Sequence, residues 1–184
     1  EPITVLVVED NDGDFILVED YLLEKFKNIE LKRSKDFRQT AITIGKNKTT
    51  LSAILLDIHL QDGSGLELIK NVLTAANDIP IIILTGYSDI SIAQLSLQLG
   101  VYDFLVKDEL NPNLLHKSID FAINRRQFIS QIESERSNFE NLFNFSPQPM
   151  WLLNADDYTI LNANLSAIEK YGYTLKEYKK KSYF

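Results

Sequence analysis

Five short runs rich in valine and isoleucine are separated by longer segments with helical periodicity, and this alternation restricts the fold more than any other feature. It is typical of βα units that build a parallel sheet. We predict strands at residues 3–8, 29–34, 53–57, 80–84 and 102–106. We predict helices at residues 15–26, 37–44, 65–75 and 90–99, and a fifth with Pro112 in its first turn.

Four of the five runs are almost entirely apolar, as expected for strands that helices cover on both faces. The second run, IELKRS, alternates polar and apolar residues instead. We therefore place it at an edge of the sheet, and we expect an α/β fold with a doubly wound parallel sheet.

The composition excludes several classes of function. With 26 acidic and 19 basic residues, the net charge of −7 disfavours binding to nucleic acid or to an anionic membrane surface. The chain has no cysteine, so it has no disulfide, thiolate metal site or cysteine nucleophile, and we expect a cytoplasmic location. No apolar run approaches the ~20 residues of a membrane span. The chain opens at Glu1 without a methionine, so we expect it to be a fragment.

Carboxylates follow two of the predicted strands. Glu9 and Asp10 come directly after the first strand, and Asp57 closes the third. In an open parallel sheet, ligands bind outside the carboxyl ends of the strands. At ~5 Å and an effective dielectric near 20, each carboxylate pair would repel by about 3 kcal/mol, and a hard cation such as Mg²⁺ would relieve this repulsion. The alternative is that Glu9, Asp10 and Asp12 cap the first helix while Asp57 merely ends a strand.

A hydroxyl and an ammonium group end the two remaining strands. Thr85 closes the fourth run and Lys107 follows the fifth. Alone, each would be read as a turn residue or a solvated side chain. Three carboxylates, a hydroxyl and an ammonium at four strand ends together indicate phosphoryl transfer, in which a carboxylate attacks while the cations neutralise phosphoryl oxygens.

At these residues the chain resembles the receiver domain of two-component response regulators, over about residues 3–125. The resemblance implies the flavodoxin-like strand order 2-1-3-4-5. It also implies that Asp57 is the phosphoacceptor and that a histidine kinase or a phosphotransfer protein of a phosphorelay donates the phosphoryl group. Glu9, Asp10, Asp57 and the backbone carbonyl of His59 would bind Mg²⁺.

The same resemblance assigns phosphoryl binding to Thr85 and Lys107, and the role of switch aromatic to Phe104. Asp108 stands where the family often has a cis proline. His59 lies two residues after the acceptor and Tyr87 two after the threonine, so their rings should hinder water and slow self-dephosphorylation. The alternative is that both rings are partly exposed and inert.

The segment after Phe121 is polar and contains no glycine or proline until the SPQP stretch, which predicts a continuing helix. The sequence from Phe139 onwards resembles the start of a PAS sensor domain, with two short strands, a helix and a capping box at Thr174. We predict a receiver domain at 1–124, a helical linker at 125–143 and a truncated α+β PAS domain at 144–184.

Steps of four and three residues along the linker give a nearly apolar seam, which predicts a homodimer through this helix. The alternative is that the stripe packs on the PAS segment. The seam consists of Phe121, Arg125, Phe128, Ile132, Glu135, Phe139 and Leu142.

The sequence thus predicts a regulatory phosphoacceptor domain rather than an enzyme, and its output module, whether kinase, cyclase or phosphatase, would lie elsewhere in the full-length protein. A pseudo-receiver that only binds proteins is the main alternative, although the intact acidic triad argues against it. A phosphatase of the haloacid dehalogenase type would need a second Asp where His59 stands. A flavodoxin-like cofactor binder would place its phosphate against the acidic loop after the first strand.

Overall fold

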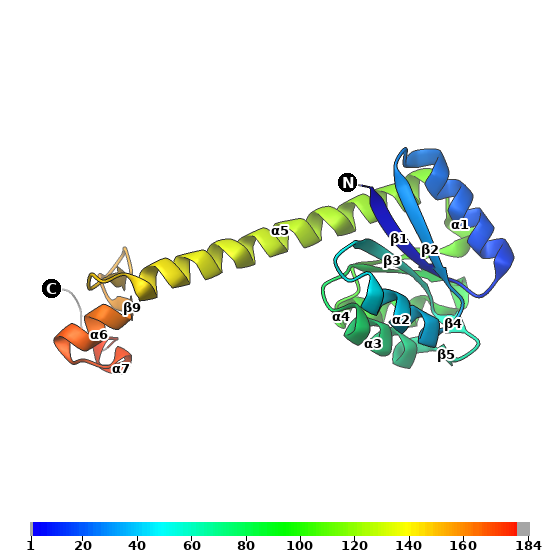
Figure 1. The fold of residues 1–184 in the computed structure, drawn as a ribbon. Coiled ribbons are helices and arrows are strands. Elements are labelled where there is room, and N and C mark those ends of the chain that lie inside the picture. The colour runs from blue at the N-terminus through cyan, green and yellow to red at the C-terminus, as the bar shows by residue number, and fades with distance from the viewer. Residues whose placement is uncertain (1, 180–184) are drawn as a thin grey trace. The chain divides into compact units, whose positions relative to one another are not determined.

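The computed structural model describes residues 2–179 and divides the chain into two compact units, Glu1–Phe128 and Ile129–Phe184 (Figure 1). The last residues of the predicted PAS segment, 180–184, lie outside the described part. None of the helices in residues 2–179 has the length and apolar character needed to cross a membrane.

The first unit is built on a five-stranded parallel sheet with the strand order β2-β1-β3-β6-β7. In chain order this is 2-1-3-4-5, so the predicted fold class and the edge position of the second strand are confirmed. The strands are β1 (Ile3–Val8), β2 (Ile29–Ser34), β3 (Leu51–Asp57), β6 (Ile81–Thr85) and β7 (Asp103–Val106).

Helices cover both faces of this sheet (Figure 1). They are α1 (Asp12–Lys25), α2 (Phe37–Lys46), α3 (Gly65–Ala76), α4 (Ile90–Gln98) and α5 (Pro112–Phe145). One apolar core joins the sheet to α2, α3 and α4, and the other joins it to α1 and the first part of α5. Along β1 the side chains alternate between the two cores, which is why the strand is apolar throughout.

Several element boundaries differ from the prediction, and the starts of the first helix and of the third strand have identifiable causes or consequences. The first helix begins at Asp12 because the side chain of Asn11 accepts hydrogen bonds from the backbone of Gly13 and Asp14. The cap is therefore Asn11 and not Glu9, Asp10 or Asp12, although Asp12 lies in the first turn of α1, where its charge complements the helix dipole. Strand β3 begins at Leu51, before the predicted residue 53, and its pairing with β1 shifts register near its start.

Short elements at the carboxyl edge of the sheet were not predicted. They are the hairpin of β4 (His59–Leu60) and β5 (Gly63–Ser64), and the 3-10 turns η1 (Tyr87–Asp89) and η2 (Lys107–Glu109). No cis peptide bond occurs within residues 2–179, so the Lys107–Asp108 bond is trans.

The second unit has a small antiparallel sheet, as predicted for the PAS segment. It contains β8 (Trp151–Leu153), β9 (Ile160–Ala163), α6 (Leu165–Tyr171) and α7 (Leu175–Tyr178). Thr174 and Glu177 form the predicted capping box of α7. The core includes Ile160, Ala167 and Tyr178.

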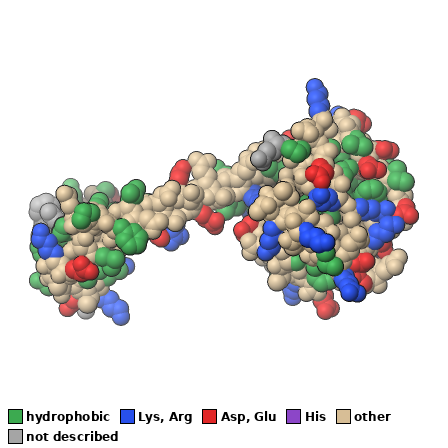
Figure 2. Space-filling view, in the orientation of Figure 1, with side chains coloured by type: hydrophobic (Ala, Val, Ile, Leu, Met, Phe, Trp, Pro, Cys, Tyr) green, Lys and Arg blue, Asp and Glu red, His purple; other side chains and the backbone are tan. Residues whose placement is uncertain are grey.

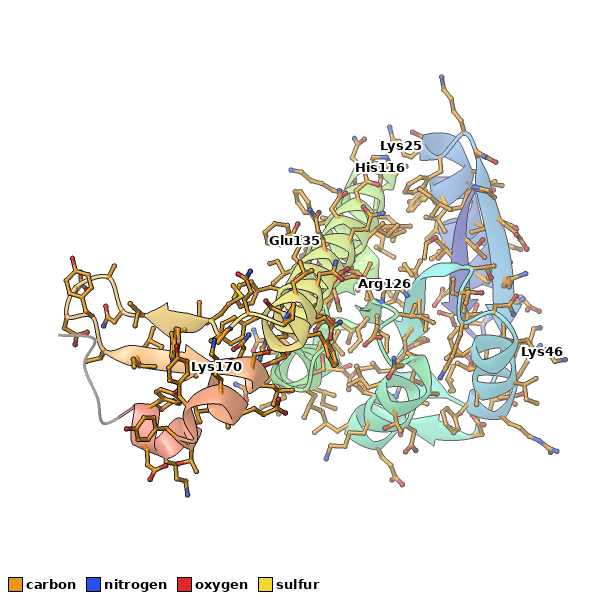
Figure 3. All side chains as sticks on the ribbon, turned by 60° about the vertical axis from the view of Figure 1, so that its left-hand side comes forward. Lys25, Lys46, His116, Arg126, Glu135 and Lys170 are labelled. Carbon is orange, nitrogen blue, oxygen red and sulfur yellow. The ribbon has the colours of Figure 1, made fainter. Side chains whose placement is uncertain are left out.

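The first turns of α5 are fixed to the sheet and to α1. Arg126 donates a hydrogen bond of 3.0 Å to the carbonyl of Leu51, where Figure 3 shows it at the junction of α5 with the sheet. The ring of His116 lies 4.6 Å from that of Phe26, at the end of α1. The helix is continuous from these contacts into the second unit.

Candidate phosphoryl-transfer site

The three carboxylates predicted to meet do so. Strands β1 and β3 are neighbours, and Val8 pairs with Leu56, so the residues that follow both strands converge. One carboxylate oxygen from each of Glu9, Asp10 and Asp57 lies within 4.8 Å of the others. Glu9 is fully buried and Asp57 is 6% exposed.

The Lys107 ammonium contacts two carboxylates of this cluster and the carboxylate of Asp14. Its ammonium nitrogen donates to Glu9 Oε2 at 2.8 Å, to Asp57 Oδ2 at 2.7 Å and to Asp14 Oδ2 at 2.7 Å. Asp14 was not predicted, because nothing in the sequence indicates that the first turn of α1 approaches the end of β7. The remaining oxygen of Asp57 accepts the backbone N–H of His59 at 3.0 Å.

The protonation equilibria reflect one ammonium shared among several carboxylates. Burial raises the pKa of Glu9, and the charge of Asp57 raises it further, while the hydrogen bond from Lys107 opposes both. Burial lowers the pKa of Lys107, but its bonds to Asp14, Asp57 and Glu9 outweigh this effect and raise it above its usual range. The two shifts are consistent with each other. Three carboxylates stabilise the charged form of one ammonium, so the pKa of Lys107 rises, but that one ammonium does not offset the burial of Glu9 and its repulsion by Asp57, so the pKa of Glu9 rises too.

The donor set suits a hard divalent cation. Glu9, Asp10 and Asp57 together form an acidic group that could hold a metal ion. All the side-chain donors are carboxylate oxygens, and Mg²⁺ prefers oxygen ligands and few protein contacts. These residues therefore fit Mg²⁺.

Thr85 and Phe104 lie on the two neighbouring strands. Thr85 ends β6, is completely buried, and its hydroxyl donates to the carbonyl of Gly86 at 3.2 Å. Phe104 on β7 pairs in register with Ile83 and packs partly buried against the core under α2, α3 and α4. The structure thus places a buried hydroxyl and a half-buried ring on adjacent strands.

His59 and Tyr87 are held at the rim by neighbouring carboxylates. His59 Nε2 lies 3.1 Å from Asp89 Oδ2, and the hydroxyl of Tyr87 donates to Glu109 Oε1 at 2.7 Å. Bonds from Ser88 and His59 lower the pKa of Asp89, whereas the Glu109 carboxylate raises the pKa of Tyr87. Both rings are more than half exposed, so the structure brings them to the rim and not into the cluster.

Comparison with protein-family models finds the response regulator receiver domain over residues 5–120. The chain belongs to the response regulator receiver family. A PAS domain model matches residues 137–183, so both predicted families are confirmed.

The receiver domain is similar to proteins with different roles. The chain is 30% identical over 139 residues to the transcriptional regulatory protein TdiR of Thauera aromatica, covering 72% of this chain and 57% of TdiR. It is 29% identical over 126 residues to a cyclic di-GMP phosphodiesterase of Thermotoga maritima, covering 68% of this chain and 32% of that protein. The chain therefore spans only part of the length of these relatives.

Solved receiver structures share the fold. A response regulator receiver domain protein from Clostridium thermocellum superposes with a TM-score of 0.60 at 22% identity, covering 69% of this chain and 98% of that one. The receiver domain of NtrX from Brucella abortus gives a TM-score of 0.58 at 24% identity, covering 65% and 98%.

The surface of the receiver unit carries both charges. On the face that Figure 2 shows, Lys and Arg side chains are interspersed with Asp and Glu side chains. The net charge of the chain is −7. The predicted lack of nucleic-acid binding remains a prediction.

Proposed function

We propose that this receiver is a phosphoacceptor that takes a phosphoryl group onto Asp57 from the phosphohistidine of a histidine kinase or a phosphotransfer protein. The observation that carries the proposal is the buried Asp57 carboxylate, 2.7 Å from the Lys107 ammonium and grouped with Glu9 and Asp10. A pseudo-receiver has no need to bury this many carboxylates around one cation, because each costs desolvation energy.

In the reaction, a carboxylate oxygen of Asp57 forms a bond to phosphorus. The bond between phosphorus and the imidazole nitrogen of the donor breaks, and its electron pair stays on that nitrogen. Lys107 donates to a phosphoryl oxygen, and the hydroxyl of Thr85 turns from the carbonyl of Gly86 to another. Glu9, Asp10, Asp57 and the carbonyl of His59 would hold Mg²⁺, which when bound would neutralise charge on the phosphoryl oxygens.

The acyl phosphate then shifts a conformational equilibrium. The phosphoryl group draws in Thr85 and Lys107, and the half-buried Phe104 moves inward into the space that Thr85 leaves. Phe104 is next to Asp103, whose carboxylate accepts from Ser118 of α5 at 2.6 Å. We propose that α5 carries this change to the PAS segment and to an output module.

Labelling with acetyl phosphate and Mg²⁺ tests the proposal on the whole chain. We expect one acid-labile, base-labile phosphoryl group per chain, absent from Asp57→Asn. Rapid multiple turnover would instead indicate a phosphatase, and no label would indicate a pseudo-receiver. An Asp57→Asn chain that still acquires an acid-labile phosphoryl group would refute the assignment of the acceptor.

A further inference from the structure

Arg33 braces the acidic loop from outside the carboxylate cluster. Its Nε donates to the carbonyl of Glu9 at 3.1 Å and its Nη2 to the carbonyl of Asp10 at 3.3 Å. Its Nη1 lies 2.7 Å from Asp12 Oδ1. One side chain on edge strand β2 thus contacts two backbone carbonyls of the loop between β1 and α1 and the side chain of the first residue of α1.

The guanidinium group is itself held in place. It lies 4.4 Å above the ring of Phe15 on α1, and its side chain is 21% exposed. Arg33 pairs in register with Val7, so it projects from the α1 face of the sheet. Because the Phe15 ring holds the planar guanidinium group in place, this group loses little conformational freedom when it binds the two carbonyls. A lysine ammonium could not bridge both carbonyls with the same geometry.

We infer that Arg33 is a positioning residue for divalent-cation binding, acting through the backbone of Glu9 and Asp10. The inference rests on the proposed function, which assigns Mg²⁺ to these carboxylates. Fixing both carbonyls fixes the backbone from which both carboxylates extend, so the cluster is organised before a cation arrives. Partners behind metal ligands commonly change metal affinity about 10- to 100-fold when they are removed.

A purely electrostatic role predicts the opposite sign. The positive charge of Arg33 near the carboxylates would disfavour a dication, so its removal alone would tighten binding. Lys35 provides a matched control, because its ammonium lies 2.7 Å from the same oxygen, Asp12 Oδ1, and none of its hydrogen bonds in the structure is to the Glu9 or Asp10 carbonyl.

The test is calorimetric titration of the whole chain with MgCl₂ at constant ionic strength, for wild type, Arg33→Lys, Arg33→Gln and Lys35→Gln. We expect both Arg33 variants to bind Mg²⁺ about ten-fold more weakly, and Lys35→Gln to bind at least as tightly as wild type. At saturating Mg²⁺, Arg33→Lys should recover the wild-type rate of acetyl phosphate labelling, since the residue acts on cation binding alone.

Wild-type affinity in Arg33→Lys, or tighter binding in Arg33→Gln, would overturn the inference and leave the charge as the only role. Thermal unfolding without Mg²⁺ checks that each variant is folded, and Arg33→Lys carries the test if Arg33→Gln is not. If the wild type does not bind Mg²⁺, both the inference and the proposed cation site are refuted. If the wild type binds Mg²⁺ and the Arg33 variants bind it with the same affinity, only the inference is refuted.

Discussion

At the scale of single residues, Lys107 uses all its donor capacity on carboxylates. A lysine ammonium has three N–H donors, and Glu9, Asp14 and Asp57 accept from it at 2.7–2.8 Å. A phosphoryl oxygen must therefore replace one of these acceptors. Asp14 is the most exposed of the three and takes no part in the proposed cation site, so it competes with the phosphoryl group.

Asp14→Asn should therefore raise the initial rate of labelling by acetyl phosphate. Removing this charge lowers the repulsion of an anionic donor and weakens the bond that occupies one N–H of Lys107, for an increase of about two- to four-fold at low salt. Asp20→Asn is the control, because it makes the same charge change further along α1 and is exposed. Equal rates in both variants would show that only net charge matters.

Lys107→Met should destabilise the first unit most at neutral pH. Removing the cation leaves buried Glu9 beside Asp57, at a cost of about 2–4 kcal/mol in the free energy of unfolding. Burial already raises the pKa of Glu9 above its usual range, and losing the Lys107 bond raises it further. Because the pKa of Glu9 is higher in the folded than in the unfolded state, its contribution to the free energy of unfolding is complete below its unfolded pKa. This contribution is lost as the pH rises through its folded pKa.

The stability difference between Lys107→Met and wild type should therefore shrink as pH falls from 7.5 towards 5. Lys107 itself does not titrate in this range, because its pKa is raised. Urea unfolding at several pH values measures the difference, and a difference that stays constant with pH would contradict this account of Glu9.

His59→Gly combined with Tyr87→Ala should shorten the half-life of the acyl phosphate several-fold. Asp89 and Glu109 hold the two rings at the rim, and we predict that the rings restrict the approach of water in line with the scissile bond. Decay of labelled chain after removal of acetyl phosphate gives the half-life. An unchanged half-life would mean that the exposed rings are inert.

At the scale of secondary-structure elements, the sequence was sufficient for the sheet and for most of the cluster. Runs of apolar residues are enough to identify the buried strands. Because the carboxyl ends of parallel strands lie at the same edge of the sheet, the sequence also predicts that Glu9, Asp57 and Lys107 lie close together, without knowledge of the helices. Asp14 and Arg33 could not be found this way. Asp14 looks like an ordinary acidic residue of a first helical turn, and Arg33 like a solvated position on an edge strand, because their contacts depend on how α1 and β2 pack.

Asn164 fastens the end of α5 to the second unit. It is fully buried, and its amide nitrogen donates to the carbonyls of Phe143 at 2.9 Å and Gln148 at 2.8 Å. Its oxygen accepts from the backbone of Met150 and Ala167, both at 2.9 Å. A single side chain thus caps α6 and joins the last turn of α5 to it.

Asn164→Ala should destabilise the second unit by about 2–4 kcal/mol, since it removes a helix cap and the buried hydrogen bond to the Phe143 carbonyl. Trp151, the single tryptophan, lies in β8 and reports this unit alone by fluorescence. Asn162→Ala is the control, because the Asn162 oxygen accepts only from the adjacent Ala163 backbone. A midpoint of unfolding equal to that of the control would contradict the role of Asn164.

At the scale of the whole molecule, α5 presents an apolar stripe to solvent. The described structure leaves Phe121 and Phe128 65% exposed, Leu142 76% exposed, and Ile132 and Phe139 about half exposed. Figure 2 shows hydrophobic side chains on the surface of this helix. The guanidinium group of Arg125, the second residue of the seam, lies 5.0 Å from the centre of the Tyr102 ring. The start of the seam therefore also contacts the sheet domain of the receiver unit.

We predict that two chains pair in parallel along this seam. Exposed rings at a and d spacing are normally buried against a partner, and a symmetric pair would cover the same face of both helices. Charge at Arg125 and Glu135 weakens the seam, so pairing should respond to changes transmitted through the first turns of α5. Light scattering at high micromolar concentration should give twice the mass of one chain.

Variants with a lysine in the seam decide where the interface lies. Phe128→Lys and Ile132→Lys should each yield monomers, because they bury a charge at an a or d position, while Ile129→Lys changes an exposed residue outside the seam and should remain dimeric. A monomeric wild type would refute the dimer. A dimer that survives both seam variants, and also survives in a chain ending at Asn124, would place the interface on the receiver unit, and the signal would then have to leave through single rather than paired α5 helices.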